Sequence, residues 1–290
     1  MHNFAYFRLT RRGGNAILSP FLPECGRERK ERMGTKMKKL IAMMMAVCMM
    51  LTMGLACAEE SAETIVVAFN PEYPPFEYVE NGEYMGYDVD LINAVAEKAG
   101  FNVEFEAMAF DAVIAAVQTN VNTIGVSGIS ITDERKLSVD FSEGYINAGL
   151  IVVVKKDSGY TTTDDLKGKV IGVQLGTTSD FAAEEITGLD NTAQYSTFLA
   201  AINDLQGDKV DAVIVDKPVG MAILASLQDD NLEIVDMGLQ ADWYGIEVNK
   251  DNPELLEKIN AALAELEAEG FYDELAVKYF SEETEATTAE

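Results

Sequence analysis

The chain lacks, over most of its length, the residues that carry much of enzyme chemistry. Its three cysteines and its single histidine all lie before residue 59. Ser-His-Asp and Cys-His catalysis need an imidazole or a thiolate, and common zinc sites need Cys or His ligands. From residue 59 onward the sequence therefore excludes these sites and any disulfide. A carboxylate-only metal site stays open, but a solvated surface is the ordinary role of so many acids. We expect no cofactor, metal or catalytic residue.

Positive charge is also scarce. Ten of the 22 Lys and Arg residues and three of the 49 Asp and Glu residues precede residue 59, which leaves 12 basic and 46 acidic side chains and a net charge of −34. Nucleic-acid binding needs clustered cations, so nucleic acid is excluded as a partner. Such acidity favours solubility and identifies no ligand.

The sequence has no apolar run suited to a membrane span. The Met-rich run from Leu40 to Leu55 has about the length of a signal peptide and follows a basic start at Met37-Lys38-Lys39. Ala56-Cys57-Ala58 then matches a cleavage site. The pattern predicts a signal peptide over 37–58 and an extracytoplasmic protein, in the periplasm or at the cell surface, that begins at Glu59.

Two features near this signal have alternative interpretations. Residues 1–36 are basic and unlike the remainder, which suggests a non-native or mis-assigned extension and a true start at Met37 or Met33. Gly54-Leu55-Ala56-Cys57 loosely resembles a lipobox but has Gly where Leu is usual. We favour free secretion, with a lipid anchor through Cys57 as the alternative.

After the signal, strand and helix patterns alternate, which predicts an α/β fold with a largely parallel sheet. The expected strands are 64–69, 103–106, 121–127, 150–154, 170–173 and 210–215, and the expected helices are 87–99, 111–118 (capped by Asp111), one from about 180, 252–267 and 272–280. Residues 283–290 form a polar, acidic tail.

Arg135 stands where a helix start usually carries Glu or Gln, after Thr132, Asp133 and Glu134. It is either an exposed side chain whose stem covers apolar surface, or part of an anion site. Small residues end the strand just before it. Gly176-Thr177-Thr178 follows another strand in the same way. Ligands of open α/β sheets bind at such strand ends, so the two places suggest an anion held between two lobes.

Six short motifs resemble those of one family. Together they are similar to the polar amino-acid-binding proteins of bacterial ABC importers, solute-binding family 3, over about residues 64–280. The motifs are Tyr73-Pro74-Pro75-Phe76-Glu77, Gly86-Tyr87-Asp88-Val89-Asp90-Leu91, Ser130-Ile131-Thr132-Asp133-Glu134-Arg135, Asp140-Phe141-Ser142, Leu166-Lys167-Gly168-Lys169 and Gly176-Thr177-Thr178.

The resemblance implies a two-lobed periplasmic-binding-protein-like α/β fold with two hinge strands and a ligand cleft between the lobes. The crossings would lie near 145–149 and 240–244. One lobe would then be 64–146 plus 244–282, and the other 147–243. Hinge closure around a ligand fits this plan.

The resemblance also implies roles for individual residues. Arg135 would bind the α-carboxylate of an amino acid, helped by the backbone of Ser130 and Thr178. Asp216 would hold the α-ammonium with Ser127 and the Gly128 carbonyl. Further ligand contacts are implied for Asn70, Tyr73, Phe110, Gln174, Thr177 and Ser179, with Tyr73 and Phe110 stacking on the side-chain end. Phe76 is expected in the core.

Asn70 occupies a position where the family often has Asp. A neutral amide favours an uncharged polar ligand such as glutamine. Glu72 would restore the charge if it pointed inward, so a cationic amino acid or cystine is the alternative. The expected partners are a free amino acid and a membrane permease with its ATPase, and we expect a monomer. Two other functions stay open: a secreted prephenate-type (cyclohexadienyl) dehydratase on the same fold, with Glu72 as its acid, and a ligand sensor for a membrane receptor.

Overall fold

The computed structural model describes residues 7–12, 15–20 and 62–287. The chain divides into two units, Met1–Ser61 and Ala62–Glu290. In the first unit β1 (Phe7–Arg12) pairs antiparallel with β2 (Asn15–Pro20), so part of the segment 1–36 forms a hairpin. The predicted signal peptide at 37–58, its cleavage site and Cys57 lie outside the described residues.

The second unit is two-lobed, and its first lobe is built on a five-stranded sheet of order β7-β3-β8-β16-β9. The strands β7, β3 and β8 run parallel, and β16 runs antiparallel to both of its neighbours. The strands are β3 (Thr64–Phe69), β7 (Asn102–Ala107), β8 (Thr123–Gly125), β9 (Asp140–Phe141) and β16 (Glu247–Val248). A separate three-stranded sheet comprises β4 (Glu72–Tyr73), β5 (Glu77–Glu80) and β6 (Glu83–Met85).

The second lobe is built on a sheet of order β12-β11-β13-β10-β14. Here β12, β11 and β13 are parallel, whereas β10 is antiparallel to β13 and β14. The strands are β10 (Ile146–Lys155), β11 (Ile171–Gln174), β12 (Thr192–Tyr195), β13 (Ala212–Asp216) and β14 (Leu232–Val235). The largely parallel sheet expected from the sequence is therefore two mixed sheets.

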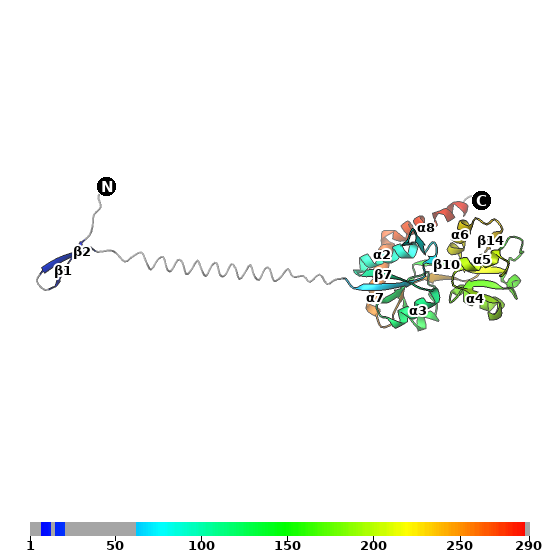
Figure 1. Cartoon of the computed structure of the whole chain (residues 1–290), viewed down its shortest axis with the longest axis horizontal. Helices are drawn as coiled ribbons and strands as arrows, with labels where there is room; N and C mark the ends of the chain where they lie inside the picture. Colours follow the sequence, from blue (N-terminus) through cyan, green and yellow to red (C-terminus); the bar gives the residue numbers. More distant parts are fainter. Residues whose placement is uncertain (1–6, 13–14, 21–61, 288–290) are drawn as a thin grey trace. The chain divides into compact units, whose positions relative to one another are not determined.

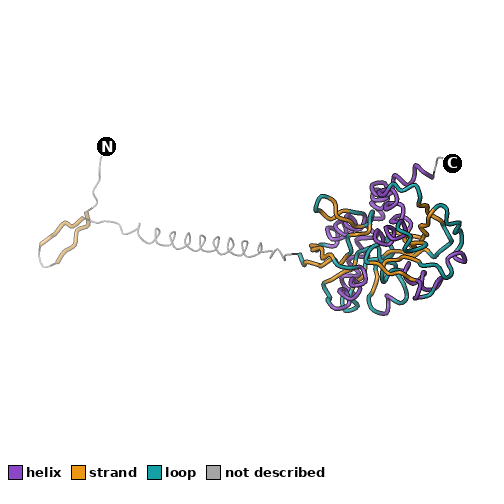
Figure 2. The backbone as a smooth tube through the Cα atoms, turned by 45° about the vertical axis from the view of Figure 1, so that its right-hand side comes forward, coloured by secondary structure: helices purple, strands orange, loops and turns teal. Residues whose placement is uncertain are grey.

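Two strands connect the lobes. The first residues of β10, Ile146–Gly149, pair antiparallel with β15 (Ala241–Tyr244), and β15 leads directly into β16 of the first lobe. Figure 1 shows β10 between the group of α2, α3 and α7 and the group of α4, α5 and α6. Helices cover the outside of the strands (Figure 2). The strands β10 and β15 stand at the crossings that the resemblance implied.

The helices begin and end where local chemistry favours it. The helices are α2 (Tyr87–Ala99), α3 (Phe110–Thr119), α4 (Thr178–Thr187), α5 (Phe198–Gln206), α6 (Lys217–Leu227), α7 (Pro253–Glu269) and α8 (Phe271–Thr287). Short 3₁₀ turns are η1 (Arg135–Leu137), η2 (Thr163–Leu166) and η3 (Leu189–Asn191). In α7, Asn252 accepts a hydrogen bond from the N–H of Leu255, Pro253 occupies the first turn, and Gly270 ends the helix with φ 82°.

Some of the expected helix limits are wrong. Helix α3 begins at Phe110, one residue before the predicted cap Asp111, and Ala109 stands at its cap without a side-chain hydrogen bond. Helix α8 continues to Thr287, into the segment predicted as a tail. The sequence patterns missed α5 and α6, although the buried residues of α5, Phe198, Ala201, Ile202 and Leu205, have the spacing of one helix face. Within the described residues, we find no helix with the length and apolarity that crossing a membrane requires.

Candidate ligand-binding site

Residues from both lobes meet around a small cavity. It has a volume of about 10 Å³, room for about one water molecule. Eight of the predicted site residues line it: Tyr73, Phe110, Gly128, Ser130, Arg135, Thr177, Thr178 and Asp216. The chain thus gathers these predicted residues, which are spread over more than 140 positions, at one place between the lobes.

Among the described residues, Arg135 is the only cation that lines this cavity. Its side chain is 9% exposed. One terminal nitrogen donates to the carbonyl of Ser130 at 2.8 Å, and the other donates across the cleft to the carbonyl of Gly176 at 3.0 Å. The guanidinium carbon lies 5.5 Å from the centre of the Phe110 ring. Its three other N–H groups have no hydrogen-bond acceptor among the described residues.

The helix expected to begin near Arg135 does not form. The chain makes a single 3₁₀ turn, η1, in which the Thr132 hydroxyl accepts the N–H of Arg135 at 3.2 Å. Val139 is fully buried and β9 begins at Asp140, so the chain must return to the sheet after one turn. Arg135 therefore does not stand at the start of an α-helix of its own segment, and its guanidinium is what this segment offers to an anion.

The second lobe does present a helix start to the cavity. Thr177 caps α4, its hydroxyl accepting the N–H of Asp180 at 3.3 Å, and Thr178 is the first helical residue. The hydroxyls of Ser130 and Thr178 lie 3.5 Å apart across the cleft. The free N–H groups of a helix start favour a negative group, so a carboxylate bound to Arg135 would also face the start of α4.

Within the part of the chain that the structure describes, Asp216 is the only acid that lines the cavity. It ends β13 and stands at the cap position of α6, yet its carboxylate caps no backbone N–H there. It accepts a hydrogen bond from the hydroxyl of Tyr73, which also lies 3.1 Å from the hydroxyl of Tyr244. Burial raises the pKa of Asp216, and the hydrogen bonds from Tyr73 and Tyr244 oppose that rise.

Two buried acids, Glu77 and Asp88, accept hydrogen bonds from Ser127 and Gly128, and the sequence analysis gave neither acid a role in the site. The Ser127 hydroxyl donates to Glu77 at 2.7 Å, and the N–H of Gly128 donates to Asp88 at 2.8 Å. The hydroxyl of Tyr145 also donates to Asp88, at 2.9 Å. Burial raises the pKa of both carboxyls, that of Asp88 to about 6.

The family is shown by comparison with known proteins. Residues 65–282 match the model of the bacterial extracellular solute-binding proteins, family 3. The chain belongs to this family. A similar curated relative is the arginine-binding extracellular protein ArtP of Bacillus subtilis (strain 168), 33% identical over 257 residues that cover 85% of this chain and 100% of ArtP.

Solved structures of this family have the same fold. The arginine-, lysine-, histidine-binding protein ArtJ of Geobacillus stearothermophilus is 36% identical, with a TM-score of 0.72 over 76% of this chain and 96% of ArtJ. An ancestral arginine-binding protein bound to arginine is 40% identical, with a TM-score of 0.70 over 75% of this chain and 98% of its own. A structure of an ancestral arginine-binding protein bound to glutamine is 38% identical, with a TM-score of 0.71 over 76% and 99%.

Membership of family 3 makes this chain an extracytoplasmic solute-binding protein and not an enzyme. The amino-acid-binding proteins of ABC importers are its relatives, and the dehydratase alternative is not favoured. Among the described residues, no group of three or more His, Cys, Asp and Glu side chains could hold a metal ion.

Four predicted residues of this family 3 protein do not line the small cavity. Asn70 and Gln174 bond to each other at 3.1 Å, and their amides also donate to the carbonyls of Met108 and Ser196. Ser127 lies behind Gly128. Ser179 is fully buried on α4, and its hydroxyl has no hydrogen-bond partner among the described residues. Phe76 is fully buried in the core, as predicted.

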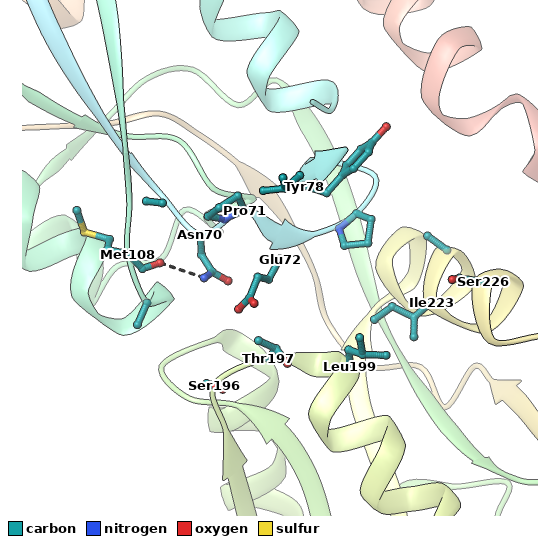
Figure 3. Close-up of a pocket in the computed structure, with 15 residues that line it drawn as sticks. Asn70, Pro71, Glu72, Tyr78, Met108, Ser196, Thr197, Leu199, Ile223 and Ser226 are labelled. Atoms are coloured by element: carbon teal, nitrogen blue, oxygen red, sulfur yellow. Dashed lines mark hydrogen bonds between the residues drawn. The ribbon is translucent and has the colours of Figure 1, made fainter. Parts of the chain in front are cut away.

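A larger pocket of about 770 Å³ opens between the lobes beside Asn70. Figure 3 shows it lined by Glu72 and Tyr78 from the first lobe and by Thr197, Leu199 and Ile223 from the second. Of the residues that the structure describes, Glu72 is the only charged one that lines it. Neither Arg135 nor Asp216 lines this pocket. Although it is the larger of the two, it lacks the residues predicted to bind a ligand's α-carboxylate and α-ammonium.

Proposed function

We propose that this protein captures a cationic amino acid outside the cytoplasm and delivers it to an ABC importer. The observation that carries the proposal is that one cation, Arg135, and one anion, Asp216, line the same cavity between the lobes. An amino acid presents an α-carboxylate and an α-ammonium, which match these two side chains. The other lining residues add hydroxyls and two aromatic rings.

Support for a cationic ligand comes from the larger pocket. Glu72 is exposed, and its carboxylate points into the pocket between Asn70 and Thr197 (Figure 3). The sequence favours glutamine because Asn70 is neutral, but the amide oxygen and nitrogen of Asn70 both form hydrogen bonds within the protein. Glu72 is therefore the group that a ligand's distal end would meet, and an acid favours an ammonium or a guanidinium. The names of ArtP and ArtJ agree with this choice.

The ligand must enter while the lobes are apart. The cavity has room for about one water molecule, and hydrogen bonds cross the cleft from Tyr73 to Asp216 and from Arg135 to Gly176. We propose that the lobes, 64–146 plus 244–282 and 147–243, open about β10 and β15 and close on the amino acid. The closed monomer then docks on a membrane permease driven by an ATPase.

The first test is a ligand screen. We would unfold and refold the purified protein to strip carried-over ligand, and titrate the twenty amino acids, ornithine and cystine while following thermal unfolding and Trp243 fluorescence. Trp243 is the sole tryptophan and lies on β15, so closure should change its emission. A ligand at a hundred times its Kd adds about 2.7 kcal/mol of stability.

Each outcome of the screen is decisive for one part of the proposal. Stabilisation by arginine, lysine or ornithine supports a cationic ligand. A response to glutamine or cystine alone keeps the binding role and overturns the cationic ligand. No response to any amino acid overturns the role.

We further propose that the protein is secreted by cleavage after Ala58, without a lipid. Intact mass of the native protein tests this, because a mature chain that starts at Glu59 differs from one that starts at a diacylglycerol-modified Cys57. A lipid mass on Cys57 would contradict free secretion, and a tryptic peptide from residues 1–32 would contradict a start at Met33 or Met37.

A further inference from the structure

Glu247 is a buried acid that the site described above does not use. It lies on β16, between β8 and β9 of the first-lobe sheet, and is 1% exposed. Neither of its carboxylate oxygens has a hydrogen-bond partner among the described residues. A buried carboxylate without a partner is costly, so the group needs either a proton or a counter-charge.

The sheet makes room for this carboxyl. Glu247 pairs across the sheet with Gly125 on β8, and a Cβ atom on Gly125 would lie 2.6 Å from Oε2 of Glu247. The side chain of Val113 on α3 lies over the same position, where it would be 3.0 Å from that Cβ. The absence of a side chain at Gly125 thus leaves a space that the Glu247 carboxyl occupies.

Glu247 shares a second cavity with Arg135. This cavity has a volume of about 230 Å³, and its lining includes Phe110, Arg135, Gly176 and Glu247. Arg135 and Phe110 line both the small cavity and this second one, whereas Gly176 and Glu247 line only the second. The guanidinium can face a ligand's carboxylate in one space and Glu247 in the other.

Few other charges face Glu247. Asp111 of α3 and Glu134, beside η1, line the same cavity and are exposed. Strand β8 contributes no titratable side chain, and on β9 Asp140 is paired with Lys250 at 2.7 Å.

Helix α7 also packs against β16, and it turns the buried residues Leu255 and Ile259 inward while Glu254, Glu257 and Lys258 are exposed. Burial raises the pKa of Glu247 to about 7, and the charge of Arg135 opposes that rise. Arg135 is thus the counter-charge on which ionised Glu247 depends.

We propose that Glu247 is a positioning residue for Arg135, and that its carboxylate takes up one proton from solvent when an amino-acid carboxylate binds to the guanidinium. The proposal rests on the proposed function, since it takes Arg135 as the carboxylate-binding residue. Before binding, an ionised Glu247 is stabilised by Arg135. After binding, the guanidinium is bonded to the ligand's carboxylate, which adds a second negative charge beside Arg135. The carboxylate of Glu247 then takes up a proton and becomes the neutral acid.

The consequence is a ligand affinity that depends on pH through Glu247. Proton uptake on binding means that the Kd rises with pH once the unliganded protein has lost this proton, by at most about tenfold per pH unit. Between pH 6.5 and 8.5 we expect the Kd for L-arginine to rise by about threefold to tenfold. The α-ammonium of the ligand, Asp216 and the Glu77–Asp88 pair also titrate, but they remain in a variant that changes only Glu247.

The test is calorimetric titration with L-arginine at pH 7.5 in buffers of different ionisation enthalpy, which counts the protons taken up. The native protein, Glu247→Gln and the control Glu257→Gln are compared. Glu257 is an exposed acid of α7 whose side chain bonds to no described residue. We expect proton uptake in the native protein and in Glu257→Gln and its loss in Glu247→Gln, with a flatter pH profile of the Kd. Equal uptake in all three overturns the proposal.

A second measurement separates failure of this proposal from failure of the proposed function. The ¹³C signal of the Glu247 carboxyl, assigned by its absence from Glu247→Asp, is followed against pH with and without L-arginine. A midpoint near 7 that rises when L-arginine is added supports the proposal, even if Glu247→Gln does not fold. A midpoint near that of a free glutamate, or one that L-arginine does not move although it binds, overturns it. If L-arginine does not bind, it is not the ligand, and in that case too a midpoint in Arg135→Gln that fails to rise overturns the link between Arg135 and Glu247.

Discussion

The hydroxyl of Tyr73, in the first lobe, donates a hydrogen bond to the carboxylate of Asp216, in the second. The same hydroxyl lies 3.1 Å from that of Tyr244, at the end of the hinge strand β15. The acid proposed to hold a ligand's ammonium is therefore bonded to a group of the other lobe. A ligand's ammonium that binds Asp216 must replace this hydrogen bond or share the carboxylate with it. The ammonium and the hydroxyl of Tyr73 therefore compete for Asp216.

Tyr73→Phe separates these two roles of Asp216. The variant should lose about 1–3 kcal/mol of unfolding free energy, because a buried carboxylate loses a donor. The affinity for L-arginine should not fall, because the hydroxyl and the ammonium use the same carboxylate. Urea unfolding and calorimetric titration measure the two quantities. Tyr84→Phe, on the exposed strand β6, is the control. Unchanged stability together with lost affinity would show that the hydroxyl serves the ligand instead.

Arg135→Ala should abolish most binding. It leaves the ligand's carboxylate buried without a cation, at a cost of about 3–5 kcal/mol, which is more than a hundredfold in Kd. The neighbouring cation Lys136 is exposed and pairs with Asp133 at 3.8 Å. Lys136→Ala should leave the Kd within about twofold. Titration of both variants decides, and retained affinity in Arg135→Ala would remove the carboxylate assignment.

Glu72→Gln tests the cationic ligand. The carboxylate is exposed, so its loss should weaken the binding of L-arginine by on the order of 1 kcal/mol, which raises the Kd about fivefold. Affinity for glutamine, if measurable, should not change. The matched control is Glu83→Gln, an exposed acid on β6. The ratio of the two affinities is the quantity to measure, and an equal loss for both ligands would mean that Glu72 does not read the distal end.

The sequence could predict the strand–helix alternation and the residues of the small cavity, but not their surroundings. The predicted strand 64–69 and helix 87–99 agree with β3 and α2, because the spacing of apolar residues within each segment marks the residues that are buried. Arg135 was assigned to an anion site through an expected helix that is only the turn η1. That assignment relied on the family resemblance more than on local physics.

The buried acids show why the rest could not be predicted. Glu77 reads as one polar residue of a short strand, yet it is fully buried because Ser127, 50 positions later, donates to it. Glu247 is buried because Gly125 pairs with it across the sheet. Such environments depend on strand register and on the packing of distant segments, which a sequence pattern does not contain.

Acid should stabilise the protein. The pKa of Glu77 is raised well above its usual value and that of Asp88 to about 6, while the unfolded chain has values near about 4. The folded state therefore binds more protons than the unfolded state above pH 4, and unfolding free energy falls as pH rises through 6. The raised pKa of Glu247 acts in the same direction. The melting temperature should be higher at pH 5.5 than at pH 7.5.

Glu77→Gln should reduce this pH dependence. The amide can accept from Ser127 and donate to Asp88, and it removes one buried ionisation, so the variant should gain on the order of 1 kcal/mol at pH 7.5 and little at pH 5. Glu80→Gln, an exposed acid on the same strand, should follow the native profile. A profile for Glu77→Gln as steep as the native one would show that this pair does not titrate as inferred.

Gly128→Ala should damage both stability and binding. Gly128 has φ 54°, and a Cβ atom there would lie 2.6 Å from Cε1 of Tyr73. The alanine must therefore strain the backbone and displace the Tyr73 ring, which lines the cavity, with an expected loss of about 1–3 kcal/mol. Gly100→Ala offers a control for the strain alone, because Gly100 has φ 78° but open space around it. If both variants lose equal stability and both keep the native affinity for L-arginine, the contact with Tyr73 is not what Gly128 provides. A loss of affinity in Gly128→Ala alone would show that the missing side chain at Gly128 is what lets Tyr73 take its position in the site.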